Sequence, residues 1–346
     1  MCDAIRSHTP TTRTVHACVL QSSPQSLLTQ HPHYTSSAQW DAGTESTTPT
    51  VEVHLFSHVL NFGQSIFEGL KAFQTVDGRV CLFNARCNVA RLNSGAERMC
   101  MPPIPEALFL DGLERTVRAN VAFIPPYGTG GSLYVRPILF GHGAEMAIAP
   151  APKFTLAFIS TPVGAFFQGA LQGKRALVRD DVDRAAPRGT GGFKVAGNYA
   201  PDMLVSRGTT ERGFDVSLFL DAKTNSFIEE FSVANFIAVA ADGTIVTPSS
   251  PSVLPSCTRK VVLRLAEELG LKAEERPIPW DEVKSLKEAA ACGTAVVLTP
   301  MKSITRGDEE VSFGSYATIQ RLYDTVVEIQ TGLRPDTLGL LHEVKL

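Results

Sequence analysis

The sequence has little of the material from which metal centres, disulfide frameworks and histidine-based active sites are built. Its seven cysteines are odd in number and scattered, and no two of them show the CxxC spacing of a zinc site. Its eight histidines include the close pair His31 and His33, which has no third ligand beside it. We therefore predict no metal site and no catalytic triad, and the unpaired cysteines favour a reducing compartment.

Long apolar runs and an excess of basic charge are absent as well. No uninterrupted apolar stretch approaches the roughly 20 residues that a membrane helix needs. The chain has 32 Lys and Arg residues against 35 Asp and Glu residues, and this net charge of -3 leaves no electrostatic footprint for nucleic acid or an anionic membrane. We predict a soluble protein whose partners are small molecules.

The first 50 residues are rich in Ser, Thr, Pro and His and show no sustained period, so we interpret residues 1–50 as a variable N-terminal arm. No acidic residue occurs between Asp3 and Asp41, a bias shared with mitochondrial transit peptides, but no amphipathic basic helix is evident. A cytoplasmic location is the prediction, and a mitochondrial one is the alternative.

The remaining length suffices for two domains with sizeable cores. Strands and helices are mixed along it, which indicates an α/β (α+β) fold. We expect a small domain over residues 51–166, a connection over 167–188 and a larger domain over 189–346. Apolar patterning predicts strands at 51–56, 80–83, 132–140, 153–160, 215–221, 234–240 and 294–299. Helical spacing predicts helices at 85–99, at 106–124, from about 257, and at 316–330.

A lysine in a glycine-rich segment is the first candidate for chemistry. In GTGGFKVAGNYA, residues 189–200, Lys194 is bracketed by three glycines and flanked by Phe193 and Val195. Glycines permit a close approach of the backbone to a ligand, and apolar neighbours favour the neutral amine that attacks an aldehyde to form a Schiff base. Taken alone, the pattern also fits a surface lysine in a flexible loop.

Three further segments follow the lysine. In SFIEEFSVANFIAV, residues 226–239, Glu229 and Glu230 interrupt an apolar stretch, where a carboxylate needs a structural ion-pair partner or a cation such as a protonated pyridine nitrogen. Ser256 is a candidate N-cap of the next helix, whose free N–H groups form a generic phosphate site. The turn in CGTAVVLTP, residues 292–300, offers further donors or simply opens a strand.

The order and spacing of these segments match the fold type IV pyridoxal-phosphate enzymes. The first half adds FGQSIFEGLKAF (62–73), LFNARCNVARL (82–92) and SLYVRP (132–137). With the KxxGNY element, they resemble the branched-chain amino acid aminotransferase family from about Val53 to Gln330. The resemblance implies a smaller N-terminal α/β domain, a larger C-terminal domain with the site between them, pyridoxal 5'-phosphate as cofactor, and a homodimer.

The resemblance also implies roles for individual residues. Lys194 would form the Schiff base, Tyr199 would reach the phenolic oxygen of the cofactor, and Glu230, with Asn235 beyond it, would face the ring nitrogen. The other cofactor contacts implied are Arg91, Arg184, Ser256, Cys257, Thr258 and Thr294. The substrate pocket implied comprises Phe67, Gly69, Tyr134, Arg136, Phe166, Thr294 and Ala295.

The chain departs from the family pattern at several of these positions. Ser232 and Val233 replace the usual Gly-Thr pair, which leaves a hydroxyl contact at Val233 without support. Phe62 and Phe166 stand where many relatives have tyrosine, which predicts a less polar pocket. The sequence also lacks the CxxC pair that follows GTA in mammalian members.

The activity implied is transamination of the branched-chain L-amino acids Leu, Ile and Val with 2-oxoglutarate. Lys194 would move the proton of the substrate, and Arg136, which shares a strand face with Tyr134, would pair the distal carboxylate of glutamate. A structural ion pair is the alternative role for Arg136. The alternative activities are D-amino acid or (R)-amine transamination, aminodeoxychorismate lyase chemistry, and a specialised biosynthetic aminotransferase; loss of catalysis is a further one, against which the retained Lys194 and Glu230 argue.

Overall fold

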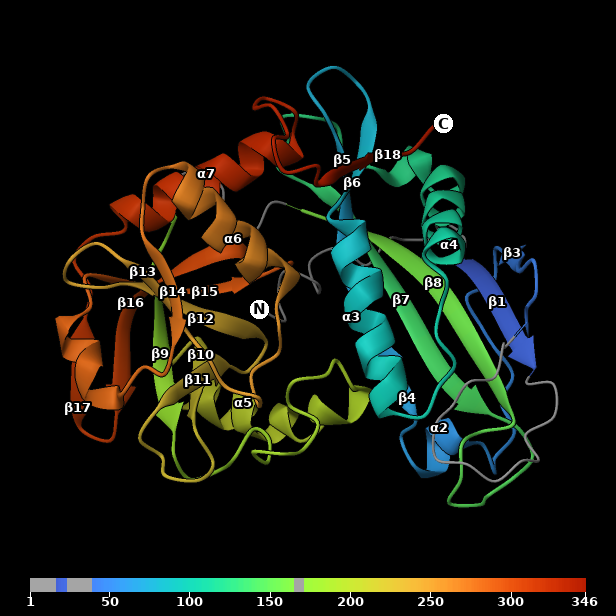
Figure 1. Cartoon of the computed structure of the whole chain (residues 1–346), viewed down its shortest axis with the longest axis horizontal. Coiled ribbons are helices and arrows are strands. Elements are labelled where there is room, and N and C mark those ends of the chain that lie inside the picture. Colours follow the sequence, from blue (N-terminus) through green and yellow to red (C-terminus); the bar gives the residue numbers. More distant parts are fainter. Residues whose placement is uncertain (1–16, 24–38, 165–170) are drawn as a thin grey trace. The chain divides into compact units, whose positions relative to one another are not determined.

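The computed structural model describes residues 17–23, 39–164 and 171–346 (Figure 1). The chain divides into two compact units. The N-terminal unit contains Cys2–Ala165, Phe193–Gly197 and Asp336–Leu346, and the C-terminal unit contains Phe166–Gly192 and Asn198–Pro335. This division differs from the expected one. The segment around Lys194 and the last residues of the chain pack with the N-terminal unit, and residues 171–188, which we expected to belong to a connection, lie in the C-terminal unit and include a strand of its sheet.

The N-terminal unit is built on an antiparallel sheet of nine described strands, in the order β18-β6-β5-β7-β8-β1-β2, with β3 paired to β1 and β4 to β7. The strands are β1 (Ala17–Ser23), β2 (Gln39–Trp40), β3 (Thr44–Ser46), β4 (Ser65–Phe67), β5 (Leu70–Gln74), β6 (Val80–Phe83), β7 (Ser132–His142), β8 (Lys153–Val163) and β18 (Leu341–Glu343). The helices are α2 (His58–Asn61), α3 (Ala85–Arg98), α4 (Glu106–Ala119) and the short 3-10 helix η1 (Val121–Phe123).

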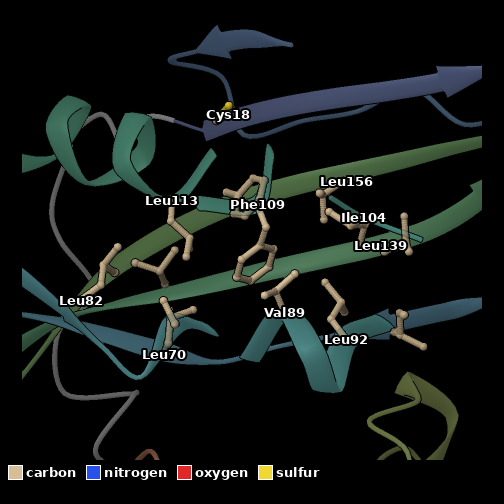
Figure 2. Close-up of a cluster of buried hydrophobic side chains, with 14 of the residues drawn as sticks. Cys18, Leu70, Leu82, Val89, Leu92, Ile104, Phe109, Leu113, Leu139 and Leu156 are labelled. Carbon is tan, nitrogen blue, oxygen red and sulfur yellow. The ribbon is translucent and has the colours of Figure 1, made fainter. Parts of the chain in front are cut away.

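Helices α3 and α4 place their apolar stripes against one face of this sheet. Val89 and Leu92 of α3 and Phe109 and Leu113 of α4 are fully or almost fully buried, and Figure 2 shows them directed towards strand residues such as Leu139. The spacing of three and four residues puts each pair on one side of its helix. The core therefore occupies the helix-covered face, and every second strand residue is left for the opposite face.

The C-terminal unit contains a mixed sheet of nine described strands, in the order β11-β10-β9-β16-β15-β12-β13-β14, with β17 paired to β16. Its strands are β9 (Lys174–Arg179), β10 (Val216–Leu220), β11 (Ile228–Phe231), β12 (Ala234–Val239), β13 (Ile245–Pro248), β14 (Ala273–Arg276), β15 (Glu288–Gly293), β16 (Val297–Arg306) and β17 (Glu309–Ser312). Its helices are η2 (Ala196–Asn198, which begins in the other unit), α5 (Asp202–Glu211), α6 (Cys257–Glu268), η3 (Trp280–Ser285) and α7 (Ala317–Gln330).

Side chains accept hydrogen bonds from backbone N–H groups at the starts of two helices of this unit, where the helix itself supplies no acceptor. The Ser256 hydroxyl accepts a hydrogen bond from the Arg259 N–H at 3.2 Å, which makes Ser256 the N-cap of α6. The buried carboxylate of Glu288 on β15 accepts from the N–H groups of Thr318 and Ile319 at 3.0 and 2.9 Å. Glu288 thus fastens the start of α7 to the sheet.

Most predicted elements are present with boundaries shifted by a few residues, but the strand predicted at 51–56 was wrong. Residues 51–54 are irregular, and the Phe56 N–H donates to the His54 ring at 3.2 Å, so a local side-chain bond competes with strand pairing. In the strand predicted at 294–299, residues 294–296 form a turn and β16 begins only at Val297.

The segment that we assigned to a variable arm contains a strand of the N-terminal sheet. Strand β1 pairs with β8 in antiparallel register, with Cys18 opposite Phe158. Among the described strands outside the first 50 residues, β1 pairs only with β8, which lies far along the sequence. No periodic pattern in the local sequence therefore predicts this strand. None of the helices in the described ranges is long and apolar enough to cross a membrane.

Candidate active site

The backbone of the Lys194 segment is attached to the N-terminal sheet. The Phe67 N–H of β4 donates to the Lys194 carbonyl at 3.2 Å, and Val195 forms an antiparallel bridge with Ile66. Val195 itself is buried in the core of that unit. The lysine is therefore presented from a fixed strand-like position.

The face of the sheet opposite the core carries the residues nearest to the lysine. Along β7, Leu133, Val135 and Leu139 are buried, so the two-residue alternation places Tyr134 and Arg136 together on the other face. The Nζ of Lys194 lies 4.8 Å from the centre of the Phe67 ring, and the guanidinium carbon of Arg136 lies 4.5 Å from the same centre. One aromatic ring is thus approached by the amine of Lys194 and the guanidinium of Arg136.

Tyr134 links this face to β5. Both Nε and one terminal nitrogen of Arg136 donate to the Tyr134 hydroxyl, at 3.1 and 2.7 Å. A side chain at Gly69 would collide with that hydroxyl, which explains the glycine. Lys71 stands directly opposite Tyr134 in the β5–β7 register, and burial lowers the pKa of its amine to about 8. Lys71 therefore belongs to the same polar face; we call Phe67, Lys71, Tyr134, Arg136 and Lys194 the lysine face.

Arg91, expected from the resemblance to hold the cofactor phosphate, is anchored by a carboxylate that our sequence reasoning did not assign to the site. Its Nε and one terminal nitrogen donate to the two oxygens of Glu68, at 2.8 and 2.7 Å. The Asn88 amide donates to the same carboxylate at 2.7 Å, and Glu68 is completely buried. This two-point pair fixes the orientation of the guanidinium.

In the C-terminal unit, the ends of the lysine loop are joined by a pair of hydrogen bonds. The Thr190 hydroxyl donates to the Asn198 side-chain oxygen at 2.6 Å, and the Asn198 amide donates to the Thr190 carbonyl at 2.8 Å. Tyr199 follows directly and is half-buried. A side chain at Gly191 would collide with the Ser252 carbonyl, so the glycine allows the loop to lie against the chain near Ser252.

Glu230 is a buried carboxylate of that unit that is held from several sides. One of its oxygens accepts from the Asn235 amide at 2.7 Å across the β11–β12 hairpin, in which the two residues are direct partners. The other accepts from the Leu254 N–H at 2.9 Å and lies 2.6 Å from a terminal nitrogen of Arg184. Only 3% of Glu230 is exposed, so its position is set by these three donors.

Two more buried carboxylates lie within the electrostatic reach of Arg184. Glu229 accepts from the Ser250 hydroxyl at 2.7 Å, and Asp202, at the start of α5, accepts from the Ser206 hydroxyl at 3.0 Å. Burial raises the pKa of both carboxyls, and the positive charge of Arg184 offsets part of this rise. We call Arg184, Asp202, Glu229 and Glu230 the carboxylate cluster; its acidic members outnumber its guanidinium three to one.

The residues expected at the cofactor phosphate occupy the start of α6 and the turn between β15 and β16. Ser256, Cys257 and Thr258 are buried at the N-terminus of this twelve-residue helix, where backbone N–H groups and the helix dipole favour an anion. Thr294 is half-buried and Ala295 is exposed in the turn.

The structure thus gathers the predicted residues into groups, unit by unit. Phe67, Gly69, Tyr134, Arg136 and Lys194 meet in the N-terminal unit, and Arg184, Glu230 and Asn235 meet in the C-terminal unit. Phe166 lies outside the described residues. The sequence reasoning did not assign Glu68, Lys71 or Asp202; only the EGLK motif, which contains the first two, carried a signal for them. Among the described residues, no three His, Cys, Asp or Glu side chains are grouped to hold a metal ion.

Comparison with known proteins agrees with this arrangement. The family model described as amino-transferase class IV matches residues 65–304, which include the lysine face and the carboxylate cluster. The chain therefore belongs to the class IV aminotransferase family.

Individual relatives narrow this assignment. The chain is 41% identical over 308 residues to the branched-chain-amino-acid aminotransferase of Helicobacter pylori, covering 88% of this chain and 91% of that protein. It is also 41% identical over 322 residues to the transaminase AMT5 of Alternaria alternata, covering 89% and 86%. The first of these two relatives places the chain with the branched-chain aminotransferases of the class.

Solved structures of such enzymes share the fold. The Escherichia coli branched-chain amino acid aminotransferase matches with a TM-score of 0.71 at 26% identity, covering 85% of this chain and 94% of that one. The T.th. branched-chain amino acid aminotransferase complexed with N-(5'-phosphopyridoxyl)-L-glutamate matches with a TM-score of 0.71 at 25% identity and the same coverage. The predicted fold type IV architecture is confirmed.

The residues of this chain fit the cofactor of the family. Next to Glu230, the Nε of Arg184 and the Oδ1 of Asn235 are buried and have no hydrogen-bond partner in the part of the chain that the structure describes. Buried polar atoms of this kind are normally paired. The Asn235 oxygen is an acceptor, and together with the excess of carboxylates it fits a cationic N–H donor such as a protonated pyridine ring.

Proposed function

We propose that the chain transaminates the branched-chain L-amino acids Leu, Ile and Val with 2-oxoglutarate, using pyridoxal 5'-phosphate bound covalently to Lys194. When bound, the cofactor supplies the electron sink that transamination requires. The observation that carries the proposal is the buried Glu230, held by three donors while further carboxylates surround its guanidinium partner. Such an environment stabilises a protonated ring nitrogen.

The other residues divide the remaining tasks. The amine of Lys194 holds the cofactor and then carries a proton to and from the substrate α-carbon. The hydroxyl of Tyr199 reaches the phenolic oxygen, and Arg91, Ser256, Cys257, Thr258 and Thr294 hold the phosphate. Because Glu68 fixes the guanidinium of Arg91, the phosphate contact needs little side-chain ordering.

The substrate is selected by the lysine face. Phe67 offers an apolar surface for an aliphatic side chain, and Arg136 offers two-point pairing for the second carboxylate of glutamate. One pocket can therefore accept both reaction partners in turn. The T.th. relative was crystallised with a phosphopyridoxyl derivative of L-glutamate, which supports the same pairing of cofactor and donor here.

A purified sample tests the proposal directly. We expect a visible absorption band from the bound cofactor, its loss on addition of L-leucine, and its return on addition of 2-oxoglutarate. Reduction with borohydride should fix the label on the peptide that contains Lys194. A label on another lysine, or a cofactor-loaded protein that ignores L-leucine, would refute the assignment.

A specialised biosynthetic aminotransferase is the second candidate. The Alternaria alternata transaminase is as similar to this chain as the branched-chain enzyme of Helicobacter pylori. Phe62 also stands where many relatives have tyrosine, and its ring is exposed. Half-reactions with L-leucine, L-phenylalanine, D-alanine and an (R)-amine separate this candidate, and D-amino acid or (R)-amine transamination, from the first.

We further infer that the protein is a homodimer. Five large apolar side chains are exposed within residues 51–62, and a second copy of the chain would remove them from water. The apolar segment defined by these residues comprises Val51, Leu55, Phe56, Leu60 and Phe62.

A further inference from the structure

Glu229 is a buried carboxylate to which the proposed function assigns no separate task. Only 4% of the residue is exposed, and all four residues of its strand, β11, are buried. Burying a charged group is costly unless it is paired or hydrogen-bonded, so an apolar side chain would suit this strand better. The reason for a carboxylate at this position must therefore lie outside the strand.

Glu229 is hydrogen-bonded to a turn between β13 and α6. Its Oε1 accepts from the Ser250 hydroxyl at 2.7 Å. The same hydroxyl accepts from the Ser252 N–H at 3.2 Å, and the Val253 N–H donates to the Ser250 carbonyl at 3.2 Å, which closes the turn. The Ser250 hydroxyl thus joins the carboxylate to the backbone of the turn. We call residues 250–253 the serine turn.

The serine turn contacts the arginine that pairs with Glu230. The Ser252 carbonyl accepts from a terminal nitrogen of Arg184 at 2.5 Å. This nitrogen also donates to the Gly191 carbonyl at 3.2 Å and lies 2.6 Å from Glu230. Immediately after the turn, the Leu254 N–H donates to Glu230 at 2.9 Å. The turn therefore supplies an acceptor that orients the guanidinium and leads directly into a donor that holds the carboxylate.

Two glycines that precede Lys194 lie against the same turn. A side chain at Gly191 would collide with the Ser252 carbonyl, and one at Gly192 would collide with the Pro251 carbonyl. Both positions therefore need glycine, which lets one backbone lie directly on the other. A shift of the serine turn would consequently move this part of the backbone as well.

We propose that Glu229 is a positioning residue for the cofactor ring: by holding the Ser250 hydroxyl it fixes the serine turn, which in turn sets Arg184 and the Glu230 carboxylate that receives the ring nitrogen. Two neighbouring residues of one strand thus have different roles, since Glu230 contacts the ring and Glu229 acts through the turn. The inference rests on the proposed function, because it requires the ring at Glu230.

The ring nitrogen of a bound probe reports on this role without any turnover. Cofactor-free protein is loaded with pyridoxine 5'-phosphate, which has the ring and the phosphate but no aldehyde, and whose ring nitrogen carries an NMR-active isotope. The chemical shift of that nitrogen, followed as pH rises, shows when it loses its proton. A well-placed carboxylate at Glu230 stabilises the protonated form, so wild type should keep this proton to a higher pH than a variant in which Glu230 has moved.

Three variants separate the hydrogen bond from the charge. Ser250→Ala removes the bond and keeps the charge, Glu229→Gln removes the charge and keeps an oxygen that accepts from Ser250, and Glu229→Met removes both. We expect Ser250→Ala and Glu229→Met to lose the ring proton at a lower pH than wild type and to bind the probe about 3- to 10-fold more weakly. Glu229→Gln should stay close to wild type. The double variant of Ser250→Ala with Glu229→Met should lose no more than either single variant, because both remove the same bond.

Glu288→Ala is the control for stability, because it removes another buried carboxylate of the same unit, one that binds α7 and not the serine turn. It should leave the titration of the ring nitrogen unchanged. If Glu229→Met does not fold, Ser250→Ala carries the test, since it loses only the hydroxyl of a half-buried side chain.

The inference alone is overturned if Ser250→Ala matches wild type, if Glu229→Gln loses as much as Glu229→Met, or if Glu288→Ala shifts the titration as far as they do. Failure of the probe to bind wild type overturns the proposed function as well.

Discussion

Arg136 donates both of its side-chain hydrogen bonds on the lysine face to the hydroxyl of Tyr134. No carboxylate of that face neutralises the guanidinium, so its charge can pair with a ligand. We predict that Arg136→Ala slows the half-reaction with L-glutamate about 10- to 100-fold, because a charge-assisted hydrogen bond contributes about 1.5–3 kcal/mol. The half-reaction with L-leucine should slow much less. Stopped-flow spectra measure both.

Arg136→Lys serves as the matched variant, since it keeps the charge but loses the two-point geometry. It should fall between wild type and alanine with L-glutamate. If the alanine variant slowed the half-reactions with L-leucine and L-glutamate equally, Arg136 would have a structural role on the lysine face and would not bind the distal carboxylate.

Lys71 makes stability depend on pH in the alkaline range. Its folded-state pKa, about 8, lies below the value of 10.5 for an unperturbed lysine. The unfolded chain therefore binds more protons between these two values, and the free energy of unfolding should rise as pH rises from about 8 to about 10. Urea unfolding of wild type and Lys71→Met measures this. The methionine variant should lack that part of the slope, and an unchanged slope would contradict the assignment.

At the scale of single elements, Glu288 connects β15 to α7. We predict that Glu288→Ala lowers the free energy of unfolding by about 1–3 kcal/mol, because the part-buried N–H of Thr318 and the buried N–H of Ile319 lose their acceptor. Glu288→Gln keeps one acceptor oxygen and should cost less. Glu267→Ala, at an exposed position on α6, is the control. If Glu288→Ala lowered the free energy of unfolding no more than this control, α7 would not need the contact with Glu288.

The elements that sequence patterning located well are those whose period is long and uninterrupted. Strand β7 alternates from Leu133 to Leu139, and α3 and α7 each repeat an apolar stripe, so local spacing suffices. Strand β1 was not predicted from local patterning, because it depends on pairing with the distant strand β8. The run at 51–56 failed in the opposite way: it alternates like a strand, but its apolar side chains include the exposed Leu55 and Phe56.

For the whole molecule, the exposed apolar segment predicts self-association. Wild type should run as a dimer in light scattering, and Leu60→Asp or Phe56→Asp should shift it towards the monomer, because a charge would be buried at the interface. Val76→Asp, at an exposed apolar position outside the segment, is the control and should remain dimeric. A monomeric wild type would contradict the inference that the protein is a homodimer.

The candidate site was predictable to the extent that it depends on motifs. The resemblance named Lys194, Arg184 and Glu230, and the structure adds that the last two are counter-ions. Glu68 escaped notice because it acts through Arg91, which is distant in sequence. A buried carboxylate has no sequence pattern of its own; its partner becomes visible only when the chain is folded.

The attachment of the Lys194 segment to β4 has a consequence for dissecting the protein. The chain leaves the C-terminal unit for only five residues, Phe193–Gly197, and then returns. A fragment that stops before this excursion would lack the lysine, and one that starts there would carry the lysine without the strand that anchors it. Neither half should be able to take up an aldehyde cofactor in the native manner, whereas mixing the two halves should restore that ability.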